Sequence, residues 1–260
     1  MPTLDNYLPA ITASSAHKRS RRLLLTTLLL FAAMALPFEA NAANTCVMVT
    51  LLPPATTNWS DSSRWTLCGG GYPGQSGAGD TANIISLLGT TINVDVPLNS
   101  VTLHIDGSIP VQIASGASLT LESSSTATSS NAFTVGSGGT MGTASGANIT
   151  GFQGAVHVNG GTFNSAGAIA FSGGTFTYSG GSLTGSGTIN INNSGVFDGA
   201  IGAMPISATT INTSGFLSYT SAANAMTLSS GASINVLSGG SFSFATDAAI
   251  NGTATEAIKV

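Results

Sequence analysis

Charged residues are scarce in this sequence of 260 residues: Asp, Glu, Lys and Arg make up 6% of it, against roughly 25% in an ordinary soluble domain. Positive charge is the scarcest, because four of the six basic residues lie before residue 43. Residues 43–260 hold two basic residues, Arg64 and Lys259, against eight acidic ones, so their net charge is near −6. A chain without basic clusters lacks the electrostatic footprint of a protein that binds nucleic acid or anionic lipid. We therefore expect no nucleic-acid partner and no membrane insertion of the mature chain.

Long hydrophobic runs are also scarce, and the most prominent is LLLTTLLLFAAMAL at residues 23–36. Its 14 residues fall short of the roughly 20 that span a bilayer. The run follows a basic segment and precedes the small residues Ala40 and Ala42, which is the layout of a secretory signal peptide. We predict that residues 1–42 are removed by cleavage between Ala42 and Ala43, so that the mature chain is secreted, extracellular or on the cell surface. An uncleaved membrane anchor is the alternative.

Cysteine is limited to two residues, Cys46 and Cys68. In an oxidising compartment such a pair is typical of a disulfide, which would stabilise the fold by about 3 kcal/mol. Two free thiols or a metal site remain as alternatives, but no histidine lies near either cysteine and zinc usually takes four ligands. We expect no cofactor and no metal.

Glycine is abundant, with 33 residues, and it separates short apolar clusters that recur along the chain. Within a cluster apolar and polar residues alternate, as in Leu119-Thr120-Leu121 and Ile189-Asn190-Ile191. This period of two is that of a strand with one buried face. Pairs such as Gly160-Gly161 and Gly180-Gly181 stand between the clusters. The regular spacing of Val, Ile, Leu and Phe argues against the disorder that Gly and Ser richness alone would suggest.

Short strands that end at glycine turns cannot form a core alone, and the density of glycine disfavours helices. Stacking provides a core: three such strands make one coil of roughly 20 residues, and successive coils pair through parallel hydrogen bonds. Residues 87–260 would then form about eight or nine coils. We predict an all-β fold, a β-solenoid of the right-handed parallel β-helix type. An antiparallel sandwich or barrel is the alternative, because these folds also have short strands and glycine turns.

Residues 56–86 differ from the repeats, since they hold both tryptophans and the second cysteine. The first coil of a solenoid has no neighbour on one side, so large side chains must cover its core. Trp59, Trp65 and Tyr72 are the candidates. We predict a capping segment at residues 43–86, which includes the disulfide, and solenoid repeats at residues 87–260.

The stretches NWSDSSRW at residues 58–65 and GYPGQSGAGDTANI at residues 71–84 resemble a segment of bacterial exported β-helix proteins. These proteins include autotransporter passengers and filamentous-haemagglutinin-like adhesins, and the later glycine-serine coils are similar too. The resemblance implies a β-helix on an exported surface protein, with cell-surface glycans or host and matrix proteins as partners. It does not specify a ligand.

Residues with catalytic chemistry are few. Asp80, Asp95 and Asp106 could place carboxylates together on adjacent coils, as glycoside hydrolysis requires, although the local sequence favours structural roles in turns for Asp80 and Asp95. His104 and His157 occur in alternating strand contexts, and we expect both to face solvent. We predict no catalytic residues and a non-enzymatic, exported, structural or adhesin-like module. A β-helix that binds or cleaves polysaccharide is the alternative.

The stretch SFSFATDAAINGTATEAIKV, residues 241–260, shows neither an amphipathic helix nor a proline break that would cover a final coil. An uncovered coil presents unpaired backbone groups beside an apolar core, and such an edge recruits further strands. We expect this chain either to be a piece of a longer protein or to associate end to end through its last coils.

Overall fold

The computed structural model describes residues 43–48, 56–75, 77–85, 90–128, 130–220, 224–244, 249–252 and 257–260. The predicted signal peptide, with Ala42 at its cleavage position, lies outside these residues, and Ala43 is the first residue described. The described part is all-β apart from one short 3-10 turn, η1 (Ser62–Arg64). It contains no helix with the length and apolar character that a membrane span requires.

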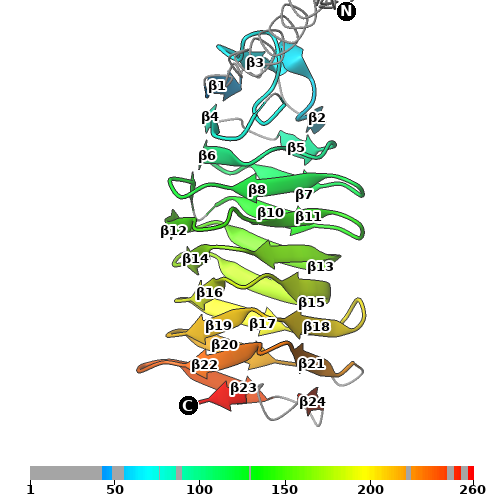
Figure 1. Cartoon of the computed structure of the whole chain (residues 1–260), viewed down its shortest axis with the longest axis vertical. Coiled ribbons are helices and arrows are strands. Elements are labelled where there is room, and N and C mark those ends of the chain that lie inside the picture. Colours follow the sequence, from blue (N-terminus) through cyan, green and yellow to red (C-terminus); the bar gives the residue numbers. More distant parts are fainter. Residues whose placement is uncertain are drawn as a thin grey trace, which may run out of the picture. The chain divides into compact units, whose positions relative to one another are not determined.

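Parallel strands stack in three columns, here called faces A, B and C, and each coil visits them in that order (Figure 1). Face A consists of β1 (Thr45–Met48), β4 (Asp80–Ile85), β6 (Val101–Asp106), β9 (Thr126–Ala127), β12 (Asn148–Phe152), β14 (Ala168–Phe171), β16 (Thr188–Ile191), β19 (Thr210–Thr213), β22 (Ser233–Val236) and β25 (Ala257–Lys259). Face B consists of β2 (Thr56–Asn58), β5 (Thr91–Val94), β7 (Pro110–Ile113), β10 (Ala132–Val135), the first parts of β13 (Ala155–Ser165) and β15 (Thr175–Thr184), β17 (Ser194–Phe197), β20 (Phe216–Tyr219) and β23 (Ser241–Phe244). Face C consists of β8 (Ser118–Leu121), β11 (Thr140–Thr143), the second parts of β13 and β15, β18 (Met204–Ser207), β21 (Met226–Ser229) and β24 (Ile250–Asn251).

The predicted β-solenoid is confirmed, with three strands to a coil. Stacked core residues on face A, Ile169, Ile189, Ile211 and Ile234, follow one another after 20, 22 and 23 residues. Within the described part, seven coils from β6 onward carry a strand on every face. The estimate of eight or nine coils was slightly high, because several coils are longer than 20 residues and the coil of β4 and β5 reaches face C only through a single bridge at Pro97.

Phenylalanine rings form the centre of the core. Phe133, Phe152, Phe171, Phe176 and Phe197 are fully buried, and the centroids of successive rings lie 5.1 to 6.3 Å apart. Tilted and edge-on pairs at such distances each add roughly 0.5–1.5 kcal/mol beyond the burial of area. The core is therefore continuous from coil to coil, as the alternating apolar clusters predicted.

Phe216 in β20 is an exception to the burial of large apolar side chains in the strands, because its side chain is 48% exposed. Leu217 and Tyr219 point inward instead, and both are fully buried. Alternation allows only one set of residues in β20 to face the core, and Leu217 stacks in register between Gly195 and Phe242. The apolar residue Phe216 therefore falls on the outer surface.

Two kinds of glycine occur at the corners. Gly116, in the turn before β8, has φ +78°, and a Cβ atom there would meet nothing within 4 Å. Gly181, where β15 passes from face B to face C, has φ +97°, and its Cβ atom would lie 2.0 Å from the carbonyl oxygen of Gly161 in the preceding coil. Glycine is thus favoured at position 116 because of the positive φ alone. At position 181 it also permits the close approach of two coils.

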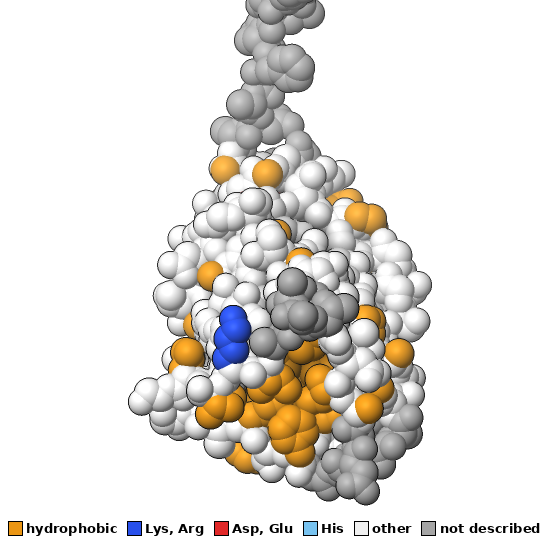
Figure 2. Space-filling view, turned by 60° about the horizontal axis from the view of Figure 1, so that its bottom comes forward, with side chains coloured by type: hydrophobic (Ala, Val, Ile, Leu, Met, Phe, Trp, Pro, Cys, Tyr) orange, Lys and Arg blue, Asp and Glu red, His pale blue; other side chains and the backbone are white. Residues whose placement is uncertain are grey.

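The C-terminal end of the stack, here called the C-terminal end face, consists of β23, β24 and β25. Among the described residues, these strands pair on one side only, with β20, β21 and β22. Figure 2 shows a gathering of hydrophobic side chains at this end. Phe244 is 51% exposed, and Phe242, Ile250 and Ile258 are partly buried against the core. Apolar surface is therefore accessible at the last described coil.

Candidate functional site

The richest polar cluster in the described chain lies at its N-terminal end, around the predicted cap. Cys46 in β1 and Cys68, just after β3 (Trp65–Thr66), form a disulfide with Cα atoms 4.8 Å apart, which is the predicted pairing. Cys46 is fully buried and Cys68 is nearly so. The disulfide ties the loop after β3 to the first strand of face A.

The two tryptophans form a hydrogen-bonded pair with their rings in contact. Trp59 is fully buried, Trp65 is 5% exposed, and their ring centroids lie 5.0 Å apart. The Trp65 indole donates to the carbonyl of Trp59 at 2.8 Å, and the Trp59 indole donates to the carbonyl of Pro73 at 3.0 Å. Tyr72, the third predicted capping residue, is partly buried against the core. Both indole N–H groups are thus satisfied within a local, apolar cluster.

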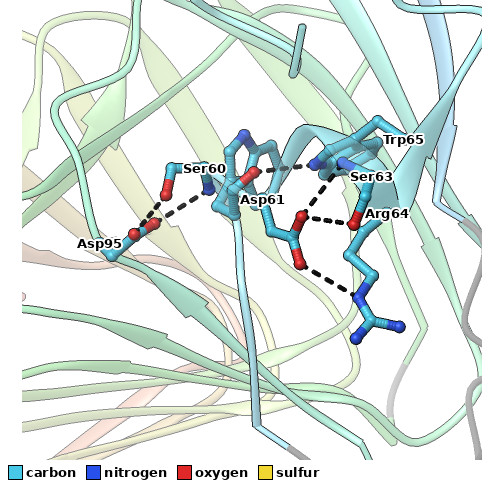
Figure 3. Close-up of polar contacts among 7 residues, drawn as sticks. Ser60, Asp61, Ser63, Arg64, Trp65 and Asp95 are labelled. Carbon is cyan, nitrogen blue, oxygen red and sulfur yellow. Dashed lines mark hydrogen bonds and ion pairs between the residues drawn. The ribbon is translucent and has the colours of Figure 1, made fainter. Parts of the chain in front are cut away.

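Asp95 follows β5 and accepts hydrogen bonds from the backbone and the side chain of Ser60, as Figure 3 shows. The backbone bond measures 3.0 Å, and the Ser60 hydroxyl donates to the other carboxylate oxygen. Asn93 in β5 adds a bond from its amide to that of Asn58 at 3.0 Å. These contacts join the turn after β2 to the next coil of face B.

Asp61 caps η1 on the exposed side of the same cluster (Figure 3). The hydroxyl of Ser63 donates to it at 2.6 Å and the backbone N–H of Ser63 at 3.1 Å, while the Arg64 guanidinium lies 3.2 Å away. The hydroxyl of Ser63, its backbone N–H and Arg64 hold the pKa of Asp61 below its ordinary value, against the opposing effect of desolvation. The Asp61 carboxylate and the Arg64 guanidinium form an exposed ion pair.

Asp80 is the one buried carboxylate in the described chain, at 3% exposure. It accepts from the backbone N–H of Asn44 at 2.8 Å and from that of Gly74 at 2.9 Å, with the Asn44 amide at 3.4 Å. The structural role predicted for Asp80 in this Gly-Asp-Thr turn is therefore correct. Asp80 joins the residue before β1, the loop at Gly74 and β4 through a single side chain.

The three aspartates considered as an acid–base set do not converge on one strand position. Asp80 begins β4 and lies beside Val101, whereas Asp106 ends β6 and lies beside Ile85, at the opposite end of the same strand pair. Asp95 follows β5 on face B. Each of Asp80 and Asp95 accepts two backbone or hydroxyl bonds, which is the pattern of a structural clamp.

The histidines lie on different faces. His104 in β6 is on face A, and its Nδ1 atom is 3.0 Å from the Thr126 hydroxyl. His157 in β13 is on face B, in register with Thr134 and Thr177. Both are half-buried among polar neighbours. No group of three or more His, Cys, Asp or Glu with a geometry suited to a metal ion occurs in the residues that the structure describes.

An amide ladder on face A was not predicted. Asn212 donates to Asn190 at 2.9 Å, and Asn235 donates to Asn212 at 2.8 Å, so three successive coils are joined by side chains. The Oδ1 atom of Asn235 is buried without a hydrogen-bond partner. The recurrence of Ile-Asn at residues 189, 211 and 234, always after Thr or Ser, was the signal that could have revealed the ladder.

These polar groups hydrogen-bond the coils and the cap to one another. The Ser60 hydroxyl donates to the Asp95 carboxylate, and no hydrogen bond to a histidine is present at Ser60 among the described residues. Comparison of the chain with protein-family models, with curated proteins and with solved structures finds no match. The residues themselves are accordingly the basis for assigning a function.

Proposed function

We propose that residues 43–260 form an exported, structural or adhesin-like β-solenoid that acts at the cell surface or outside the cell without catalysing a reaction. Its partners in this proposal are cell-surface glycans or host and matrix proteins. The proposal rests on the sequence of residues 1–42, on the scarcity of charge and on the nature of the outer faces.

The observation that carries the proposal is the bonding of outward polar side chains from coil to coil. Thr162 and Ser182 are 3.0 Å apart on face C, Thr175 and Ser194 are 3.1 Å apart on face B, and the asparagine ladder runs along face A. All three faces thus present hydroxyl or amide groups at outward positions, with few charged side chains among them. Such rows suit hydrogen bonding to the hydroxyls of a glycan or to an extended polypeptide.

The enzymatic alternative has less support. Polysaccharide cleavage requires two carboxyl groups about the substrate, roughly 5–10 Å from each other. Asp80 is buried in a clamp, and Asp106 lies at the other end of the neighbouring strand. This separation favours a binding or structural role over hydrolysis.

A paired assay tests the proposal. The purified mature chain is applied to arrays of surface glycans and immobilised matrix proteins, and the same glycans are analysed for new reducing ends or unsaturated products. We expect saturable binding that changes little with salt, because the described faces carry few charges, and no cleavage. Product release would support the enzymatic alternative, and failure to bind any glycan or matrix protein would refute the adhesin-like role.

Matched variants locate the binding face. Thr210→Arg on face A, Thr177→Arg on face B and Thr227→Arg on face C each place one cation at an outward strand position. All three should fold, because surface substitutions usually change stability by less than about 0.5 kcal/mol. Binding that is lost in one variant and kept in the other two identifies the face. Equal binding in all three would place the ligand elsewhere.

End-to-end association through the C-terminal end face is a further part of the proposal. Its strands pair on one side only among the described residues, and Phe244 is half exposed beside them. Lys259 is the one charged side chain described in these strands, so like-charge repulsion offers little protection of the edge.

A further inference from the structure

The loop after β3 is attached to the solenoid differently from the rest of the cap. Within the described part of the chain, residues 67–71 reach other segments through the Cys46–Cys68 disulfide and through no hydrogen bond; the bond from Gly71 N–H to the Cys68 carbonyl lies within the loop. Leu67 is 75% exposed, so burial does not hold it either. The Cys46–Cys68 disulfide and the buried side chain of Cys68 therefore carry the attachment of this loop.

The backbone around Cys68 is held in an unusual conformation. Leu67 has φ +62°, in the left-handed region that disfavours residues with a Cβ atom, and Gly69 and Gly70 on the other side also have positive φ. Release of the disulfide would let Leu67 return to an ordinary conformation. Local strain and the disulfide thus oppose each other.

β3, the strand before this loop, covers the outer edge of β1, which is the first strand of face A. β1 pairs in parallel with β4 over four residues, and on its other side it pairs with β3 in the antiparallel direction over two. One side-chain bond, from Thr66 to the Val47 carbonyl at 3.2 Å, is added to this short pairing. A two-residue strand is marginal by itself, so the cover on the edge of β1 depends on the disulfide-bonded loop after β3.

The inner layer of the cap has independent anchors. The backbone N–H of Trp59 donates to the Asn93 carbonyl, and that of Ser60 donates to the Asp95 carboxylate. Gly74 donates to the Asp80 carboxylate and accepts from the Asn99 amide. These bonds do not involve the disulfide or β3. The cap therefore divides into an inner layer fixed to the solenoid and an outer flap, residues 65–72, which comprises β3 and the loop after it.

We propose that the Cys46–Cys68 disulfide is a redox latch, and that its reduction opens residues 65–72 and uncovers the outer edge of β1 while the solenoid stays folded. In the closed state the flap is held by two strand pairs, by the buried Trp65 indole with its hydrogen bond to the Trp59 carbonyl, and by the partly buried Tyr72. In the open state the flap regains the conformational entropy of its residues, and in this proposal these contacts alone do not offset that gain. In the closed state the disulfide limits this freedom and β3 blocks the edge against further strands.

Opening requires an external dithiol. Its thiolate attacks the sulfur of Cys68, the less buried of the two cysteines, and the Cys46 sulfur leaves as a thiolate and takes up a proton. The second thiol of the reagent then attacks its own sulfur in the mixed disulfide and releases Cys68. Two electrons pass from the dithiol, which becomes a disulfide, to the protein, which gains two thiols.

The two tryptophans of the chain, Trp59 and Trp65, report the inner layer and the flap separately. In Trp59→Phe the remaining indole is in the flap, and in Trp65→Phe it is in the inner layer. Acrylamide quenching is measured before and after dithiothreitol, with thiol alkylation to verify reduction and far-UV circular dichroism to follow the solenoid. We expect quenching of Trp65 to rise several-fold, quenching of Trp59 to stay low, and the dichroism to stay unchanged.

Three results would overturn the proposal. Low quenching of Trp65 after verified reduction would mean that the flap needs no latch. Loss of the β signal would mean that the cap does not open apart from the solenoid, and strong quenching of both indoles would refute the division into two layers. Hydrogen exchange of the wild-type chain guards against a folding defect in either variant: exchange in β3 should accelerate on reduction, while exchange in β5 should not.

Discussion

Gly181→Ala is predicted to destabilise the solenoid more than Gly116→Ala, although both glycines have positive φ. A Cβ atom at Gly116 meets nothing within 4 Å, so the cost is that of the left-handed backbone, about 1–2 kcal/mol. The restriction of the unfolded chain offsets roughly 0.4–1 kcal/mol of it. We therefore expect Gly116→Ala to lower the free energy of unfolding by about 1 kcal/mol.

At Gly181 a second cost is added. The new Cβ atom would lie 2.0 Å from the Gly161 oxygen and 2.7 Å from the Gly160 carbonyl carbon. Both atoms belong to the backbone of the preceding coil, so no side chain can rotate away and the two coils must separate locally. Overpacking of this kind costs about 1–3 kcal/mol, which gives an expected total near 3 kcal/mol for Gly181→Ala.

Urea titration followed by far-UV circular dichroism measures the difference. The two variants should have similar m-values and different midpoints, because the surface exposed on unfolding is the same. Equal midpoints would refute the predicted difference between the two variants. They would show that the coils containing β13 and β15 do not approach as closely as the stacking of Gly161 and Gly181 requires. A lowered m-value for Gly181→Ala alone would instead indicate that unfolding has lost cooperativity along the stack.

Phe176→Asp should lower the free energy of unfolding by more than about 4 kcal/mol, because it removes a fully buried ring and buries a carboxylate. Thr177 points outward, so Thr177→Asp should lower it by less than about 0.5 kcal/mol. Similar denaturation midpoints for the two variants would mean that the register is wrong. Acidification should loosen η1, because the pKa of Asp61 is lowered in the folded state. Such a carboxylate stabilises the fold above its unfolded pKa near 3.8, and this stabilisation is lost as pH falls through the folded pKa. The loosening should change the tryptophan fluorescence, and Asp61→Asn should abolish that acid-induced change. The intact mass of the exported protein should be that of a chain that begins at Ala43 and contains the disulfide. Retention of residue 1 would contradict the predicted cleavage. Sedimentation over a concentration series should reveal association through the C-terminal end face, and a monomer at every concentration would refute it.

The strand pattern could be predicted because it depends on local alternation. Residues such as Ile189 and Ile191 bracket a polar Asn190, and a strand with one buried face has only one way to place them. The spacing of the clusters then indicated three strands to a coil. Phe216 shows where prediction from alternation fails: β20 holds three large side chains in four positions, and the sequence does not state which of them face the core.

Contacts between coils were harder to predict, because the residue that lies above another depends on the length of the coil between them. Successive core positions are separated by 20, 22 or 23 residues on face A, and an error of one residue moves a side chain to the opposite face of its strand. The asparagine ladder needs three strands in exact register, so it is visible only after the stack is built. The bond between Ser60 and Asp95 spans 35 residues and faces the same difficulty.

The two ends of the described stack differ for a reason that lies in its one-dimensional construction. Each coil gains stability from the coil on either side, so an end coil must replace the missing neighbour or expose its core. At the N-terminal end a disulfide, two buried indoles and the buried Asp80 carboxylate take that place. At the C-terminal end Phe244 is half exposed, and the Asn235 amide leaves an acceptor unpaired beside Lys259, its neighbour in register. Side-chain ladders and strand edges there both end with unused bonding capacity, and this difference supports the proposed association through the C-terminal end face.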